Sequence, residues 1–289
     1  MEIRPSSLFK YFSLNDRTID SLRRGYLYGA APIQLNDPFD CSLDFLGFGS
    51  IQDMVELELL DKHEVKGKDS QDRELLKLVR NRFQIQFFRE WGIISMTDIP
   101  DSILMWSYYA GHDGICVEYD YSKFPFEYRG PFKVEYPSRI EEREVKSGFE
   151  AVKYLTTVKM QDWVNESEWR ILGKVKEPLF LEVPGIPGLE KIGGVERKFY
   201  YPVTAVKSIT LGRYFFDPYE DLQVSMVNDL YKIRCCLGVK RHILDFALIH
   251  EIPFFYMGVD REMQKLKREP VRIRPNDDHT GFDFVMGPP

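Results

Sequence analysis

The segment KMQDWVNESEWRIL, residues Lys159 to Leu172, concentrates tryptophan, glutamate and arginine in a stretch with strand-like sequence. In an extended chain, successive side chains point to opposite faces. Apolar Trp163, Trp169 and Ile171 would then share one face. The other face carries three charged residues: Glu166, Glu168 and Arg170. The pattern therefore predicts a strand whose aromatic face packs into the core and whose opposite face presents a pair of carboxylates.

Two interpretations of this carboxylate pair are open. A catalytic carboxylate must be held rigidly, and a packed aromatic backing would hold Glu166 and Glu168 in that way. A strand with a structural Glu–Arg ion pair has the same pattern, and Arg170 would then neutralise its neighbours. The spacing by itself does not separate catalysis from a structural role.

Composition indicates a folded protein with a large core. The chain has 289 residues, of which 44% are hydrophobic and 29% charged, values typical of soluble globular proteins. The 39 basic and 45 acidic residues give a net charge of −6. An excess of acidic residues argues against general binding to nucleic acids or to anionic membrane surfaces.

Cysteine and histidine spacing gives no metal signature. The cysteines at 41, 116, 235 and 236 form no CxxC motif, so we expect free thiols in a reducing cytoplasm. No two of the five histidines have the spacing of metal ligands on a helix, and no metal is expected. The chain also lacks a signal-peptide pattern and any run of 18 apolar residues, which predicts a cytoplasmic protein without a membrane partner.

Hydrophobic periodicity predicts one α+β domain over residues 1–289, with a mixed or antiparallel β core. A helical insertion is expected at about 50–90, and a helical and strand extension with flanking C-terminal helices at about 215–289. Predicted strands lie near 8–12, 26–29, 91–97, 115–121, 133–136, 163–172, 179–183, 197–201, 206–211 and 252–257. Predicted helices lie near 17–24, 103–112, 148–158, 217–233 and 240–250. No phosphate-loop, GxGxxG, HExxH or GxSxG motif occurs.

Four segments together resemble the bacterial domain-of-unknown-function 2971 family: LFKYFS at 8–13, LYGAAPIQLNDPFD at 27–40, LMWSYYAGHDGICVEY at 104–119, and KMQDWVNESEWRIL at 159–172. The shared features are a lysine–tyrosine strand, an NDPFD loop, a central tryptophan with tyrosine–alanine and histidine, and a late WxxExEWR. Two departures are Phe12, where many members have arginine, and Tyr108, where histidine is frequent.

The layout of these segments is in turn similar to that of ADP-ribosyltransferases. The resemblance implies an NAD-cleaving or ADP-ribosylating effector, a toxin or phage-defence protein, with NAD as the substrate. It implies that Glu168 is the catalytic carboxylate that stabilises the positively charged ribose, and that Glu166 serves the acceptor. The implied nucleotide contacts are Lys10, Tyr11, Asn36, Asp37, Tyr109, which would stack on nicotinamide, and His112.

Two alternatives remain at this stage. The first alternative to the NAD-using effector is a non-catalytic sensor or interaction module, whose Asn36 to Asp40 loop and glutamates bind a peptide or a small cation. The second is a magnesium-dependent nuclease. The nuclease would use four carboxylates, those of Asp37, Asp40, Glu166 and Glu168. The macromolecular acceptor and the oligomeric state are not predicted.

Overall fold

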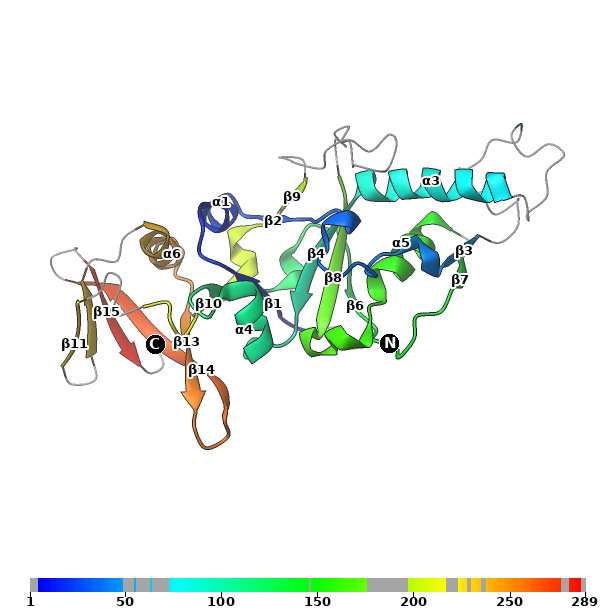
Figure 1. Cartoon of the computed structure of the whole chain (residues 1–289). Helices are drawn as coiled ribbons and strands as arrows, with labels where there is room; N and C mark the ends of the chain where they lie inside the picture. The colour runs from blue at the N-terminus through cyan, green and yellow to red at the C-terminus, as the bar shows by residue number, and fades with distance from the viewer. Residues whose placement is uncertain are drawn as a thin grey trace.

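The computed structural model describes residues 5–48, 55, 63, 73–145, 147–175, 197–216, 223–227, 230–234, 238–276 and 281–286. Eleven strands form one mixed sheet in the order β11-β12-β15-β14-β13-β10-β5-β1-β4-β8-β6 (Figure 1). Only β10 and β13 run parallel among these neighbours. The strands are β1 Leu8–Phe12, β4 Trp91–Thr97, β5 Ile115–Tyr119, β6 Arg129–Lys133, β8 Glu168–Lys174, β10 Val206–Leu211, β11 Gln223–Val227, β12 Leu230–Arg234, β13 Phe254–Asp260, β14 Lys265–Pro275 and β15 Gly281–Met286.

Helices flank this sheet, which confirms the α+β class. They are α1 Asp16–Arg24, α3 Arg73–Glu90, α4 Ile103–Ala110, α5 Gly148–Thr157 and α6 Gly238–Ile249. Two small sheets pair β2 Tyr26–Tyr28 with β9 Lys198–Tyr200, and β3 Leu46–Phe48 with β7 Arg143–Val145. The first helix of the expected 50–90 insertion and the expected strand at 179–183 lie outside the described residues.

Local sequence explains why α1 begins and ends where it does. The Asn15 side chain accepts a hydrogen bond from the backbone N–H of Thr18, which satisfies one of the free donors of the first turn. Gly25 follows the last turn with φ 62°, a left-handed conformation that glycine adopts without a Cβ penalty. Both caps follow from residue type, because asparagine favours the N-cap position and glycine favours the position after the last turn.

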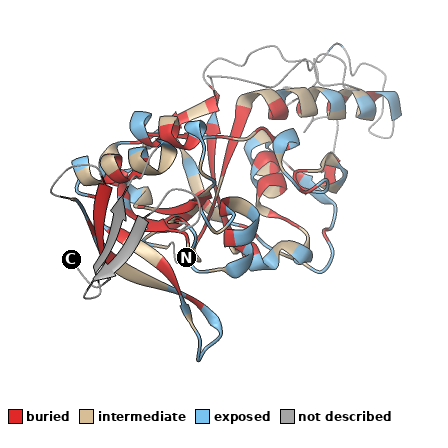
Figure 2. Cartoon of the chain, turned by 60° about the vertical axis from the view of Figure 1, so that its left-hand side comes forward, coloured by how far each residue is buried: buried red, intermediate tan, exposed pale blue. Residues whose placement is uncertain are grey.

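The two faces of the sheet carry different apolar clusters. Leu8 and Met96 pack with α1 and α6 on one face. On the other face, Phe9 and Tyr11 pack with α4, while Ile93 packs with α3 and α5. Figure 2 shows the buried residues running along the sheet and the inner sides of these helices. On this second face, the gap between the α4 cluster and the α3–α5 cluster holds polar side chains.

Three glycines from separate strands and loops make room for one aromatic ring. A Cβ atom added to Gly29, Gly92 or Gly173 would overlap the ring of Phe199 on β9. The small sheet can therefore lie directly over β4 and β8 because these positions have no side chain.

The structure corrects two of the predicted elements. Residues 161–166 form a 3₁₀ helix, η4 (Gln161–Glu166), rather than the first half of a strand, and β8 begins only at Glu168. Ser167, with φ 43°, breaks the extended backbone between them. In the C-terminal extension, β11 and β12 pair where the pattern predicted a helix over 217–233. That extension is mainly strand, with α6 as its described helix.

No helix among the described residues has the length and apolar character needed to cross a membrane.

Candidate functional site

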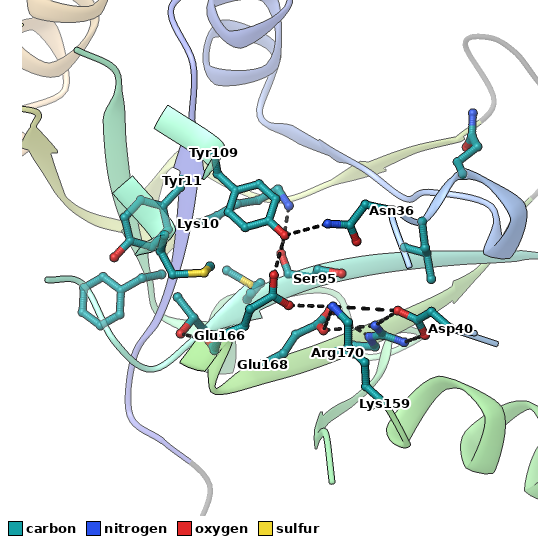
Figure 3. Close-up of a pocket in the computed structure, with 16 residues that line it drawn as sticks. Lys10, Tyr11, Asn36, Asp40, Ser95, Tyr109, Lys159, Glu166, Glu168 and Arg170 are labelled. Atoms are coloured by element: carbon teal, nitrogen blue, oxygen red, sulfur yellow. Dashed lines mark hydrogen bonds and ion pairs between the residues drawn. The ribbon is translucent and has the colours of Figure 1, made fainter. Parts of the chain in front are cut away.

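Five buried charged residues gather in the polar gap on the second face of the sheet, and we call them the charged cluster: Asp40, Lys159, Glu166, Glu168 and Arg170. Strand β8 supplies Glu168 and Arg170, and η4 supplies Glu166. Asp40 comes from the loop that precedes η2 (Leu43–Phe45). Lys159 lies between α5 and η4. Segments far apart in the chain therefore meet at one place (Figure 3).

Arg170 is the centre of the hydrogen bonding. Its Nη1 and Nη2 donate to the two carboxylate oxygens of Asp40, at 2.7 and 2.5 Å. Its Nε donates to Oε1 of Glu168 at 2.8 Å, and Nη2 also reaches Oε2 of Glu168 at 3.0 Å. A guanidinium shared between two carboxylates in this way is held in a fixed orientation.

Lys159 joins the remaining carboxylates. Its Nζ lies 2.6 Å from Oε2 of Glu166 and 3.4 Å from Oε2 of Glu168. A third carboxylate oxygen, on Asp40, is 4.0 Å away. Three carboxylates thus face two cations, which leaves the charged cluster with one excess negative charge.

Lys10 approaches this negative charge through an opening in the sheet. Strands β1 and β4 share one paired position, Phe9 with Thr97. Beyond it, the Lys10 Nζ donates to the Ser95 carbonyl oxygen at 2.8 Å. Burial lowers the pKa of Lys10 to about 8, although the negative charge of Glu168 acts in the opposite direction. Lys10 therefore loses its proton more readily than an exposed lysine.

Glu168 stays ionised in this environment. Burial by itself would raise its pKa, but the charges of Arg170 and Lys159 outweigh burial and hold the pKa at about 2. The neighbouring Glu166 accepts a hydrogen bond from the Tyr109 hydroxyl at 2.5 Å. Burial and this carboxylate raise the pKa of Tyr109, so its hydroxyl remains a donor.

Three adjoining cavities surround Tyr109, which lines all of them. The central cavity, about 220 Å³, is lined by residues that include Lys10, Ser95, Glu166, Glu168 and Arg170. The acidic groove, about 760 Å³, is lined by Asn36, Asp37, Pro38, Phe39, Leu104, Met105, Tyr108, Tyr109, Met160, Asp162, Trp163, Asn165 and Glu166. The basic cavity, about 790 Å³, has the charged residues Lys10, Arg17, Asp20 and Lys198 in its lining.

Most of the residues implied by the resemblance lie around these cavities. Lys10, Asn36, Tyr109, Glu166 and Glu168 line the central cavity. The amide nitrogen of Asn36 donates to the Tyr109 hydroxyl at 3.1 Å. Asp37 lines the acidic groove instead. Phe9 pairs with Thr97, which in turn pairs with Glu168, so Tyr11 and Glu168 lie on the same face of the sheet.

Two of the implied ligand contacts do not reach the site as expected. Tyr11 borders the central cavity, but its hydroxyl donates to the Ile99 carbonyl oxygen at 2.8 Å, and its ring packs against Trp106. His112 lies outside the lining of all three cavities. It follows the C-terminus of α4 with φ 59° and shares a 2.8 Å hydrogen bond with the Ser107 hydroxyl. A structural role at the helix end accounts for this histidine.

Sequence reasoning missed Lys159 and Ser95 as members of the candidate site, and it named Asp40 only in the sensor and magnesium-nuclease alternatives. Lys159 and Asp40 lie within the segments that carry the resemblance, Lys159 near Glu166 in the sequence and Asp40 near the Asn36 turn. This proximity could have identified both as site residues. Ser95 contributes its backbone carbonyl oxygen to Lys10 and its side chain to Glu168, and this placement depends on the pairing of β4 with β8. Among the described residues, no group of three or more His, Cys, Asp or Glu is arranged to hold a metal ion.

Comparisons with protein-family models, with curated proteins and with solved structures find no match to this chain. Its function therefore has to be argued from the site itself.

Proposed function

We propose that the central cavity and the basic cavity bind a dinucleotide and that the protein cleaves the N-glycosidic bond of NAD, as an ADP-ribosyltransferase-like or NAD-glycohydrolase-like effector. The observation that carries the proposal is the placement of a buried carboxylate pair, Glu166 and Glu168, beside a cavity lined by basic residues. Cleavage of this bond develops positive charge on the ribose, and a fixed carboxylate stabilises that charge.

The basic cavity supports binding of the phosphates. Lys10, Arg17 and Lys198 line it together with a single carboxylate, Asp20. Lys198 lies 3.3 Å from Asp20, so Lys10 and Arg17 supply the excess positive charge. Because Lys10 also lines the central cavity, a diphosphate held there would extend its ribose toward the charged cluster. Tyr109 then stands where the nicotinamide ring would stack.

The two glutamates take different roles in this proposal. Both carboxylate oxygens of Glu168 are occupied by Arg170 and Lys159, so Glu168 holds these cations in place. Glu166 also accepts hydrogen bonds at both oxygens, from Tyr109 and Lys159, but it alone of the two glutamates lines both the central cavity and the acidic groove. We therefore assign Glu166 as the carboxylate that faces the ribose, and Glu168 as a positioning residue.

One observation favours a second function, a sensor that binds the nucleotide without cleaving it. Each buried carboxylate of the charged cluster is within 4.0 Å of a lysine or arginine nitrogen, and neutralised carboxylates stabilise a developing cation less than free ones. The same ion pairs weigh against the magnesium-nuclease hypothesis, because Arg170 already occupies both oxygens of Asp40.

An NAD-consumption assay tests the proposal. The purified protein is incubated with NAD, nicotinamide release is measured by chromatography, and NAD binding is measured by calorimetry. Glu166→Gln should reduce turnover about a hundredfold or more while binding persists. Glu90→Gln is the matched control, because Glu90 forms only a partly exposed pair with Lys174, and its turnover should equal that of the wild type.

The outcomes separate the candidates. Binding of NAD without nicotinamide release would support the sensor. The absence of both binding and release would overturn the proposed function in either form.

A further inference from the structure

The acidic groove has a charge pattern opposite to that of the basic cavity. Its lining includes three carboxylates, those of Asp37, Asp162 and Glu166, and no lysine, arginine or histidine among the described residues. Glu166 is paired with Lys159, which leaves Asp37 and Asp162 as the source of negative charge.

Aromatic side chains stand among these carboxylates with much of their surface in solvent. Phe39 is 55% exposed and Tyr108 is 65% exposed, and both line the groove together with partly buried Trp163. Such rings cost free energy when left in water and are typical of binding surfaces. Their π faces attract cations. The Nζ of buried Lys159, which lines the central cavity and not the groove, lies 4.5 Å from the centre of the Trp163 ring.

Asp37 supplies an independent indication of a ligand. The residue is 4% exposed, and its Oδ1 accepts a hydrogen bond from the backbone N–H of Phe39. Its Oδ2 has no hydrogen-bond partner within the described part of the chain. A buried carboxylate oxygen without a donor is costly. A ligand that brings a charged donor into the groove would satisfy it.

We propose that the acidic groove binds a guanidinium group, with its plane stacked on the exposed aromatic rings and its N–H groups donated to Asp37 and Asp162. A guanidinium fits this combination better than an ammonium ion. It is planar, weakly hydrated and able to stack on rings while it donates several hydrogen bonds. The inference goes beyond the proposed function, because the groove holds this group whether or not NAD is cleaved.

The test uses amino-acid derivatives of matched shape as probes. The full-length protein, labelled with ¹⁵N at its tryptophan indoles, is titrated with acetyl-arginine-amide, and the Trp163 signal is assigned by Trp163→Phe. We expect a saturable shift of the Trp163 signal at millimolar concentration. The signal of Trp106, which is fully buried on α4, should not move.

Three comparison probes define the chemistry. Acetyl-citrulline-amide has nearly the same shape as the arginine derivative but no charge, and it should bind at least about tenfold more weakly, because it lacks a charge-assisted hydrogen bond. Acetyl-lysine-amide should also bind more weakly. Nicotinamide tests whether the groove selects a neutral aromatic amide instead. Equal or tighter binding of any one of the three would overturn the assignment to a guanidinium.

Variants of the protein locate the binding site. Asp37→Asn keeps the acceptor for the Phe39 N–H and should weaken binding about tenfold. Asp162→Asn, at an exposed position, tests the same charge effect without risk to folding. Tyr108→Ala should weaken binding about threefold. Asp245→Asn, on α6 and paired with Arg241 at 3.6 Å, is the matched control and should leave binding unchanged.

Two further probes distinguish a free small molecule from a protein side chain as the source of the guanidinium group. Agmatine represents a free small molecule, and a short arginine-containing peptide represents a protein side chain. Binding of either one supports the groove assignment, and the tighter of the two identifies the source. No shift with any guanidinium probe, or shifts that persist in both Asp162→Asn and Tyr108→Ala, would overturn it.

Discussion

Replacement of Glu168 by glutamine should destabilise the protein strongly, because this carboxylate holds both cations of the charged cluster. Glu168 accepts hydrogen bonds from Arg170 at 2.8 and 3.0 Å and lies 3.4 Å from Lys159. A glutamine keeps the size but turns one acceptor into an N–H₂ group, which then faces the donors of Arg170 or Lys159. Breaking a buried ion pair from one side costs about 3–5 kcal/mol.

The pKa of Glu168 gives a second estimate of the free energy that this carboxylate contributes to folding. A fall from the ordinary value of 4.5 to about 2 corresponds to roughly 3 kcal/mol of stabilisation of the ionised, folded state. Because the folded-state pKa is depressed, this contribution is fully present above about pH 4.5 and is lost as the pH falls through about 2. The gap between wild type and Glu168→Gln should therefore be about 3 kcal/mol at pH 7 and should close toward pH 2.

Urea unfolding followed by tryptophan fluorescence measures this gap. The matched control is Glu90→Gln, because Glu90 pairs with Lys174 at the other end of β8, where the lysine side chain is 67% exposed. Solvent screening limits that pair to about 0.5 kcal/mol. A loss below about 1 kcal/mol for Glu168→Gln at pH 7, or a gap that does not change with pH, would refute the ion-pair argument.

Three further predictions follow from particular contacts. Binding of an anionic nucleotide should weaken as the pH rises through about 8, because Lys10 loses its proton there. Calorimetry across this pH range measures the affinity. Lys10→Met should weaken binding at pH 7 and remove the fall in affinity near pH 8. Trp169→Ala, at a 3% exposed position, should lower the free energy of unfolding by about 3–5 kcal/mol, whereas Trp163→Ala should lower it by about 1 kcal/mol. Equal losses of stability in chemical unfolding would contradict the burial assigned to the two tryptophans. Gly173→Ala should destabilise by about 1–3 kcal/mol, because its methyl group would overlap the Phe199 ring; an unchanged melting temperature would show that the ring moves aside freely.

Part of this structure follows from local sequence. The caps of α1, the strand at 206–211 and the helix at 103–112 are set by neighbouring residues, through side-chain caps and alternating hydrophobicity. The alternation of β8 also predicts that Glu168 and Arg170 share a face, because their separation of two residues is a local property of an extended chain.

Predictions failed where two patterns competed or where a turn intervened. The apolar residues between 217 and 233 suit a helix, but β11 and β12 gain hydrogen bonds from each other and from β15, which periodicity does not reveal. Trp163 and Trp169 belong to different elements, because the left-handed backbone at Ser167 separates η4 from β8. Trp163 is accordingly only partly buried.

The sequence by itself determined the α+β class, the main strands of the core and the local grouping of Glu168 with Arg170. Only the tertiary structure decided that Asp40 meets Arg170 across 130 positions of chain and that Lys10 enters through the opening between β1 and β4. It also decided that His112 stays outside the cavities. The physical reason is that backbone alternation acts between neighbours in sequence. The charge balance of a buried site depends instead on strand order and loop packing, which bring distant residues together.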